Sequence, residues 1–172
     1  MAICICVLLV LSSPIAFATD QIDLSVGLKT LFLMNNKISG TVAVAVVFDP
    51  VNAESKTDAE TIKNNIDSGN GIPNGLTLSA HLVSIHDLEK SPGAKVIFLA
   101  KDLSAVNFDA VNRTATATGA LTMSTDLECV KTNKCILGIV SRPRVTIYFS
   151  ETAANASHIG FAPAFLMLVQ QI

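Results

Sequence analysis

The stretch Thr122–Ser150, TMSTDLECVKTNKCILGIVSRPRVTIYFS, decides how the last third of this chain folds. It contains an apolar strand, Cys135–Val140, and a second strand, Arg144–Phe149. Only the tight turn Ser141–Pro143 separates them. A parallel crossover needs about a dozen residues or more, so this short turn predicts an antiparallel hairpin.

Upstream of the hairpin, predicted strands alternate with predicted helices. Three strands are apolar on both faces, which is typical of parallel strands covered on both sides: Thr41–Phe48, Ala94–Ala100 and Thr118–Ser124. A fourth strand, Leu76–Ser84, alternates apolar with polar residues and therefore belongs near a sheet edge. We predict helices at Asp20–Asn36, Ala105–Val111, Asp126–Lys131, Glu151–His158 and Phe161–Ile172, and a short helical turn at Asp87–Lys90.

Two helices carry finer predictions. In the first, an apolar stripe recurs at helical spacing and should face the core: Leu24, Leu28, Leu31 and Phe32. The second should begin near Thr57 and Glu60, which have capping-box spacing, and bury Ile62 and Ile66. The turn-rich segment Ser68–Gly75 should close it. The order of elements predicts a single-domain α/β fold: a mixed, mainly parallel open sheet with helices on both faces and an antiparallel C-terminal hairpin.

Residues 1–18 have the pattern of a secretory signal peptide. The apolar run Ile3–Leu11 precedes Ala16-Phe17-Ala18, a small-x-small cleavage pattern. Cleavage would make Thr19 the first residue and leave 19–172 as the mature domain. The alternative is a membrane anchor, but the run is shorter than the roughly 20 apolar residues that a span needs. Both interpretations place the domain outside the cytoplasm.

Composition narrows the class of protein. The 172 residues suit one domain, and half of them are apolar, which is too hydrophobic for disorder. A net charge of -2 gives no electrostatic footprint for nucleic acid or an anionic membrane, so we expect no nucleic-acid partner. With no Trp and one Tyr, aromatic stacking platforms are scarce.

Cys129 and Cys135 are the cysteines that remain once the signal peptide is removed. In an exported protein, two cysteines this close are most simply a disulfide. Chain entropy gives about 2–2.5 kcal/mol for so small a loop. A redox-active pair is the alternative, since Lys131 and Lys134 lie within the loop and could lower a thiol pKa. The spacing, however, is not CxxC, and no His is near.

No catalytic motif occurs in the sequence. The glycines form neither GxGxxG nor a P-loop, and GxSxG, SxxK and HExxH are absent. His81 and His86 are five apart and His158 is distant, whereas zinc needs three or four converging ligands. We therefore predict a protein with no enzymatic activity, no metal and no other cofactor.

Polar residues follow the ends of the apolar strands. They are Asp49, Lys101, Ser124 and Asp126. In open α/β sheets, ligands favour the crevice beyond the carboxyl ends of the strands. These four residues are therefore a candidate crevice for a small polar ligand. The alternative is that loop ends are polar everywhere. The crevice supports a second hypothesis for function, a periplasmic small-solute-binding module associated with a transporter.

The C-terminal third also carries a family pattern. A strand ending in Ser124 to Asp126 leads into the Cys129–Cys135 segment and then into an apolar strand around Gly138. A tight turn, a strand to Ser150, the Ala-rich helix Glu151–Ser157 and the apolar segment Phe161–Val169 follow. This order resembles the YfiR-like family of periplasmic proteins. The chain departs from the family in having the single Gly138 where a double glycine is usual.

The resemblance implies a periplasmic regulator without enzymatic activity. Relatives bind the periplasmic part of an inner-membrane diguanylate cyclase and hold it inactive, which couples cyclic-di-GMP signalling and biofilm formation to envelope conditions. By this resemblance, a Cys129–Cys135 disulfide would stabilise the repressing form. Relatives can be dimeric, so a homodimer is an expected assembly. The expected partner is an inner-membrane sensor protein.

Overall fold

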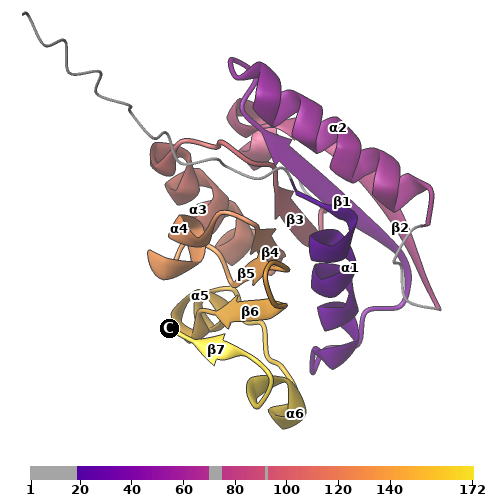
Figure 1. Ribbon diagram of the computed structural model, residues 1–172, viewed down its shortest axis with the longest axis vertical. Helices are drawn as coiled ribbons and strands as arrows, with labels where there is room; N and C mark the ends of the chain where they lie inside the picture. The colour runs from indigo at the N-terminus through magenta and orange to yellow at the C-terminus, as the bar shows by residue number, and fades with distance from the viewer. Residues whose placement is uncertain (1–18, 70–74, 92) are drawn as a thin grey trace, which may run out of the picture.

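The computed structural model describes residues 19–69, 75–91 and 93–172 of the chain (Figure 1). They form a seven-stranded sheet in the order β2-β1-β3-β4-β5-β6-β7. The strands are β1 (Gly40–Phe48), β2 (Leu76–Ser84), β3 (Val96–Leu99), β4 (Leu121–Ser124), β5 (Leu137–Val140), β6 (Thr146–Phe149) and β7 (Gln170–Gln171).

The predicted fold class is confirmed. The pairs from β2 to β5 are all parallel, and β5 pairs antiparallel with β6 in a register that sets Leu137 opposite Phe149. β2 is the edge strand, as its alternating pattern predicts. The helices are α1 (Gln21–Lys29), α2 (Ala53–Asp67), α3 (Phe108–Thr118), α4 (Leu127–Lys131), α5 (Glu151–Ala156) and α6 (Pro163–Leu166), with the 3₁₀ helices η1 (Thr30–Leu33), η2 (Ile85–Lys90) and η3 (Ala105–Asn107).

Helices cover both faces of the sheet, and two glycines mark how closely they approach it. A Cβ on Gly27 of α1 would lie 2.6 Å from Ile139 Cδ1. A Cβ on Gly138 of β5 would lie 2.5 Å from Val130 Cγ1 of α4. Neighbouring residues of a strand point to opposite faces, so α1 and α4 lie on opposite sides of β5. Figure 1 shows the same division, with α1 on one side of the sheet and α4 on the other.

The first helix follows the predicted stripe with one exception. Leu24, Leu28 and Leu31 are buried in the core, but Phe32 is 49% exposed. The helix changes to 3₁₀ geometry at Thr30, which rotates Phe32 away from the sheet.

The second helix begins earlier than predicted. Asn52 is its N-cap, and its side chain accepts the N–H groups of Glu54 and Ser55. Thr57 is therefore inside the helix, where its hydroxyl donates to the carbonyl of Ala53. The prediction of a capping box at Thr57 was wrong. The burial of Ile62 and Ile66 is confirmed, whereas residues 70–74 of the predicted turn lie outside the described residues.

Two further boundaries differ from prediction. The helix predicted at Ala105–Val111 continues to Thr118, where Gly119 ends it at φ 62. The next strand, β4, is correspondingly shorter than the predicted Thr118–Ser124. β2 also departs from strict alternation, since Leu82 is 36% exposed and the next residue, Val83, is buried.

The predicted helix Phe161–Ile172 was wrong. α6 is a single turn, and the chain then adds β7, which pairs with β6 in parallel at Tyr148 and Gln170. Phe161 and Phe165 stack with ring centroids 4.2 Å apart and are buried. Leu168 is 72% exposed. The apolar residues of this segment therefore fall into two groups: Phe161 and Phe165 pack in the core, and Leu168 faces solvent.

The predicted signal peptide, residues 1–18, lies outside the described residues. Within residues 19–69, 75–91 and 93–172, every helix is too short or too polar to cross a bilayer.

Candidate functional site

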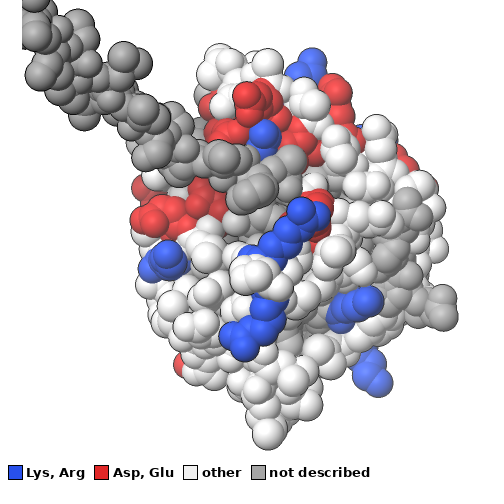
Figure 2. Space-filling view, in the orientation of Figure 1, with Lys and Arg blue, Asp and Glu red and all other residues white. Residues whose placement is uncertain are grey.

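The carboxyl ends of four parallel strands, β1, β3, β4 and β5, meet at one edge of the sheet. Two hollows open along this edge, one beside the start of α1 and the other beside the start of α2. Figure 2 shows Asp and Glu side chains gathered at the top and upper left of the molecule, near the starts of α2 and α3, with Lys and Arg mostly below.

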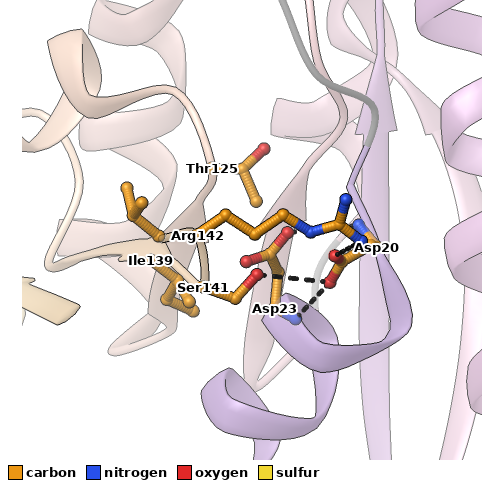
Figure 3. Close-up of a pocket in the computed structure, with 7 residues that line it drawn as sticks. Asp20, Asp23, Thr125, Ile139, Ser141 and Arg142 are labelled. Carbon is orange, nitrogen blue, oxygen red and sulfur yellow. Dashed lines mark hydrogen bonds and ion pairs between the residues drawn. The ribbon is translucent and has the colours of Figure 1, made fainter. Parts of the chain in front are cut away.

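The first hollow has a volume of about 380 Å³ and combines the start of α1 with the turn after β5. Its lining residues are Asp20, Asp23, Thr125, Ile139, Val140, Ser141 and Arg142 (Figure 3). Opposite charges and hydroxyl groups therefore line one small space, above an apolar floor from β5.

Asp20 ties the start of α1 to the β5–β6 turn. Its Oδ1 accepts the N–H groups of Ile22 and Asp23, which makes it the N-cap of the helix. Arg142 Nη2 lies 3.0 Å from the other oxygen, Oδ2. Burial raises the pKa of Asp20, but the two N–H donors and Arg142 outweigh it and leave the pKa below its usual value. Asp20 is thus a charged carboxylate that already has partners.

Asp23 has the opposite character. Asp23 is only 8% exposed. One carboxyl oxygen, Oδ2, accepts the N–H of Asp20 at 3.2 Å and completes a capping box. The other, Oδ1, is buried and has no hydrogen-bond partner in the described part of the chain. Burial raises the pKa of Asp23; the Ser141 hydroxyl, which donates to Asp20 Oδ1 at 3.5 Å, lies near enough to Asp23 to oppose that shift.

A buried carboxylate oxygen without a donor is costly, because desolvation is not compensated. A ligand that donated a hydrogen bond to this oxygen would remove that cost. Arg142 is 73% exposed and uses one of its five N–H donors on Asp20, so it can still bind an incoming carboxylate. In Figure 3 the Asp23 carboxyl lies beneath the Arg142 side chain. The hollow thus offers an acceptor for an ammonium group beside a donor for a carboxylate.

The second hollow contains two of the four residues predicted as a ligand crevice. Asp49 and Asp126 both line this open space of about 720 Å³. Each is also used locally, since Asp49 Oδ1 accepts the N–H of Val51 and Asp126 Oδ1 accepts that of Glu128. Polar residues at the ends of loops commonly make such hydrogen bonds.

The other two predicted residues do not line this hollow. Ser124 is buried, and its hydroxyl accepts the N–H of Asp126. Lys101 Nζ lies 2.9 Å from Glu54 Oε2, a bond that raises the pKa of Lys101. Lys101 therefore lies beside the space and neutralises part of its acidic rim.

Cys129 and Cys135 form a disulfide that joins α4 to the segment just before β5, with the two Cα atoms 5.2 Å apart. Both cysteines are fully buried. The enclosed loop is held by further bonds, because Asn133 Oδ1 accepts the Ser150 hydroxyl at 2.7 Å. Burial keeps the sulfurs from solutes, which favours a structural role over redox exchange.

The described residues contain no group of three or more His, Cys, Asp or Glu side chains placed to hold a metal ion. His81 is exposed on the edge strand, where its Nε2 lies 3.2 Å from the Ser79 hydroxyl.

Sequence reasoning missed the three charged residues of the first hollow. Asp20 appears in the sequence as a helix-start residue, and Asp23 three positions later fits a capping box, so both have a structural explanation. Arg142 lies in a turn more than a hundred positions away. Only the strand order reveals that the turn after β5 lies against the start of α1.

No family model and no curated protein matches the chain. Several solved structures resemble it, among them the following two. One is a conserved domain protein from Vibrio cholerae O1 biovar El Tor strain N16961, at a TM-score of 0.57 and 13% identity. The other is an ABC domain from Streptococcus pneumoniae in complex with L-Trp, at a TM-score of 0.61 and 12% identity. They are matched over 86% and 87% of this chain, which spans 59% and 60% of theirs. At such low identity, the likeness establishes a shared fold.

Proposed function

We propose that this protein is a non-enzymatic binding protein, and that its first hollow binds a small solute carrying both an ammonium and a carboxylate group. Free α-amino acids are the first class to test. The observation that carries the proposal is the buried Asp23 Oδ1, which lacks a partner and lies in a hollow shared with Arg142.

The charges of the hollow favour this class of solute. An ammonium would donate to Asp23 and restore the hydrogen bond that burial denies it. A carboxylate would bind the free side of Arg142, whose planar guanidinium suits it. Thr125 lines the same wall, while its hydroxyl lies 3.2 Å from that of Thr19. The neighbour of similar fold that was solved with L-Trp supports an amino acid as the first candidate.

Isothermal titration calorimetry against the twenty amino acids tests the proposal. We expect measurable binding of at least one, and loss of that binding in Asp23→Asn and in Arg142→Gln. Arg144→Gln is the matched control, since Arg144 is an exposed arginine two positions away that does not line the hollow. Binding that survives both hollow variants, or that disappears equally in the control, would contradict the assignment.

We propose further that the protein acts in the periplasm and regulates an inner-membrane signalling protein, such as a diguanylate cyclase. The resemblance of the C-terminal third to the YfiR-like family supports this role, as does the disulfide at the corresponding place. In this scheme, the solute bound beside α1 changes how the domain meets its membrane partner. A homodimer is the expected assembly.

The alternative function is a solute-binding module of a transporter, and the similar fold of the neighbour solved with L-Trp favours it. Membrane pull-down with mass spectrometry separates the two. Recovery of a sensor with a cytoplasmic cyclase or kinase domain supports regulation, and recovery of a permease supports transport. Failure to find a sensor, with unchanged biofilm on deletion, would refute the regulatory role.

A further inference from the structure

Thr19 is the first described residue, and it is held inside the domain. It is 4% exposed. Its backbone nitrogen donates to Asp58 Oδ1 at 2.9 Å, and its hydroxyl donates to Asp58 Oδ2 at 3.0 Å. The same hydroxyl lies 3.2 Å from that of Thr125. The start of the described chain is therefore fixed at the carboxyl edge of the sheet, between the two hollows.

Asp58 is a carboxylate of α2 that is only 3% exposed. Besides Thr19, its donor is the backbone N–H of Lys101, at 2.9 Å from Oδ2. The ammonium of Lys101 bonds to Glu54 and interacts with Asp58 only at longer range, without a hydrogen bond. Every donor that the described residues give Asp58 is thus neutral. Carboxylates this deeply buried ordinarily have a paired positive charge.

The sequence supplies a source for that charge. The pattern Ala16-Phe17-Ala18 predicts cleavage immediately before Thr19. We propose that the chain is processed between Ala18 and Thr19, and that the new α-ammonium of Thr19 is the counter-ion of Asp58. The nitrogen that donates to Asp58 is the atom that cleavage would charge.

The chemistry is a peptidase-catalysed hydrolysis. Water adds to the Ala18 carbonyl, the C–N bond to Thr19 breaks, Ala18 leaves as a carboxylate, and the Thr19 nitrogen takes up a proton as an ammonium. Because Thr19 is buried in the folded domain, cleavage must precede folding of this edge. Export of an unfolded chain provides that order.

Processing would also affect the first hollow, because Thr19 directly precedes the N-cap Asp20 and contacts Thr125 of the hollow wall. The ion pair with Asp58 would fix the start of α1 and with it both carboxylates of the hollow. This proposal concerns maturation and is independent of whether the hollow binds a solute.

The first test is the intact mass of the protein purified after export of the full-length chain. The proposal predicts a chain that begins at Thr19. A mature chain that begins at any other residue, or one that keeps its leader, overturns it.

The second test measures the ion pair by unfolding in urea at pH 6.5, where an α-amino group is mostly protonated. A chain that begins at Ala18 keeps the Thr19 N–H but moves the charge by one residue. Because a charge-assisted bond is about twice as strong as a neutral one, the folding equilibrium constant should fall on the order of tenfold. In Asp58→Asn, the same extension should have no effect. An equal effect in both backgrounds, or none in either, refutes the pairing.

Should Asp58→Asn fail to fold, reductive methylation followed by peptide mass spectrometry still decides. The Thr19 α-amine should be labelled at least about tenfold more slowly in the native protein than in urea. Equal labelling rates would overturn the proposal.

Discussion

Replacing Asp23 by Asn should make the folded protein more stable while it removes solute binding. Asn has the same shape, and its Oδ1 can still accept the Asp20 N–H that lies 3.2 Å from Asp23 Oδ2. The replacement removes a buried negative charge whose second oxygen has no partner. A carboxylate kept at a cost to stability is typical of a binding site.

The sign of the effect follows from the pKa of Asp23, which burial raises above its ordinary value of 3.8. The folded state then binds this proton more tightly than the unfolded state, so stability falls as pH rises from 3.8 through the folded pKa. Above the folded pKa the full cost is present. An unsatisfied buried polar group costs about 1–3 kcal/mol, of which the Asn amide recovers part. We expect a gain of about 1 kcal/mol, or a melting temperature higher by about 2–4 °C.

Thermal and urea unfolding of the wild-type protein and of Asp23→Asn, at pH 7 and at pH 3, measures this difference in stability. The variant should be the more stable at pH 7, and the difference should shrink at pH 3, where Asp23 is protonated. A variant that is less stable at pH 7, or a difference independent of pH, would refute the reasoning.

Asp20→Asn is the matched control with the opposite sign. The N–H donors of Asp23 and Ile22, together with Arg142, lower the pKa of Asp20 despite its burial. Its contribution is present above 3.8 and is lost as pH falls through the folded pKa. Asn is an equally good N-cap, so the variant should lose only the ion pair, a few tenths of a kcal/mol at pH 7.

Three further predictions concern the scaffold. Gly138→Ala should lower the free energy of unfolding by about 1–3 kcal/mol, because its Cβ would lie 2.5 Å from a buried valine of α4. The double variant Cys129→Ser, Cys135→Ser should have a free energy of unfolding lower by about 2.4 kcal/mol. The native disulfide should resist reduction by dithiothreitol until the protein unfolds, which alkylation followed by mass spectrometry would show. Phe165→Ala should lower the free energy of unfolding by about 3–5 kcal/mol, whereas Leu168→Ala should change it by less than about 0.5 kcal/mol. Similar losses in the two variants would contradict this arrangement and favour the predicted C-terminal helix.

The architecture could be predicted because its signals are local. Apolar runs without alternation marked the parallel strands, and the short turn at Ser141–Pro143 fixed the antiparallel pair. Boundaries depended on competing local signals. Thr57 and Glu60 fit a capping box, yet Asn52 caps the helix five residues earlier. At the C-terminus, Phe161 and Phe165 fit a helix, but pairing with β6 makes the last residues a strand.

The candidate site could be predicted only in part. Asp49 and Asp126 were found because the carboxyl ends of parallel strands share an edge. The same rule could not show that Ser124 is buried beneath Asp126. Nor could it find Arg142, whose distance from Asp20 is set by the packing of α1 on β5. A free carboxyl oxygen such as that of Asp23 is a property of three-dimensional packing and leaves no mark in a single sequence.

The most direct test of the binding proposal is a ¹⁵N–¹H NMR titration of the protein with the amino acid that calorimetry selects. The proposal predicts that the largest shifts fall on the backbone amides of Thr125 and Ser141 and on the side-chain Nε–H of Arg142. An absence of shifts would contradict it, as would shifts confined to another hollow of the molecule, which Lys95 and His158 help to line.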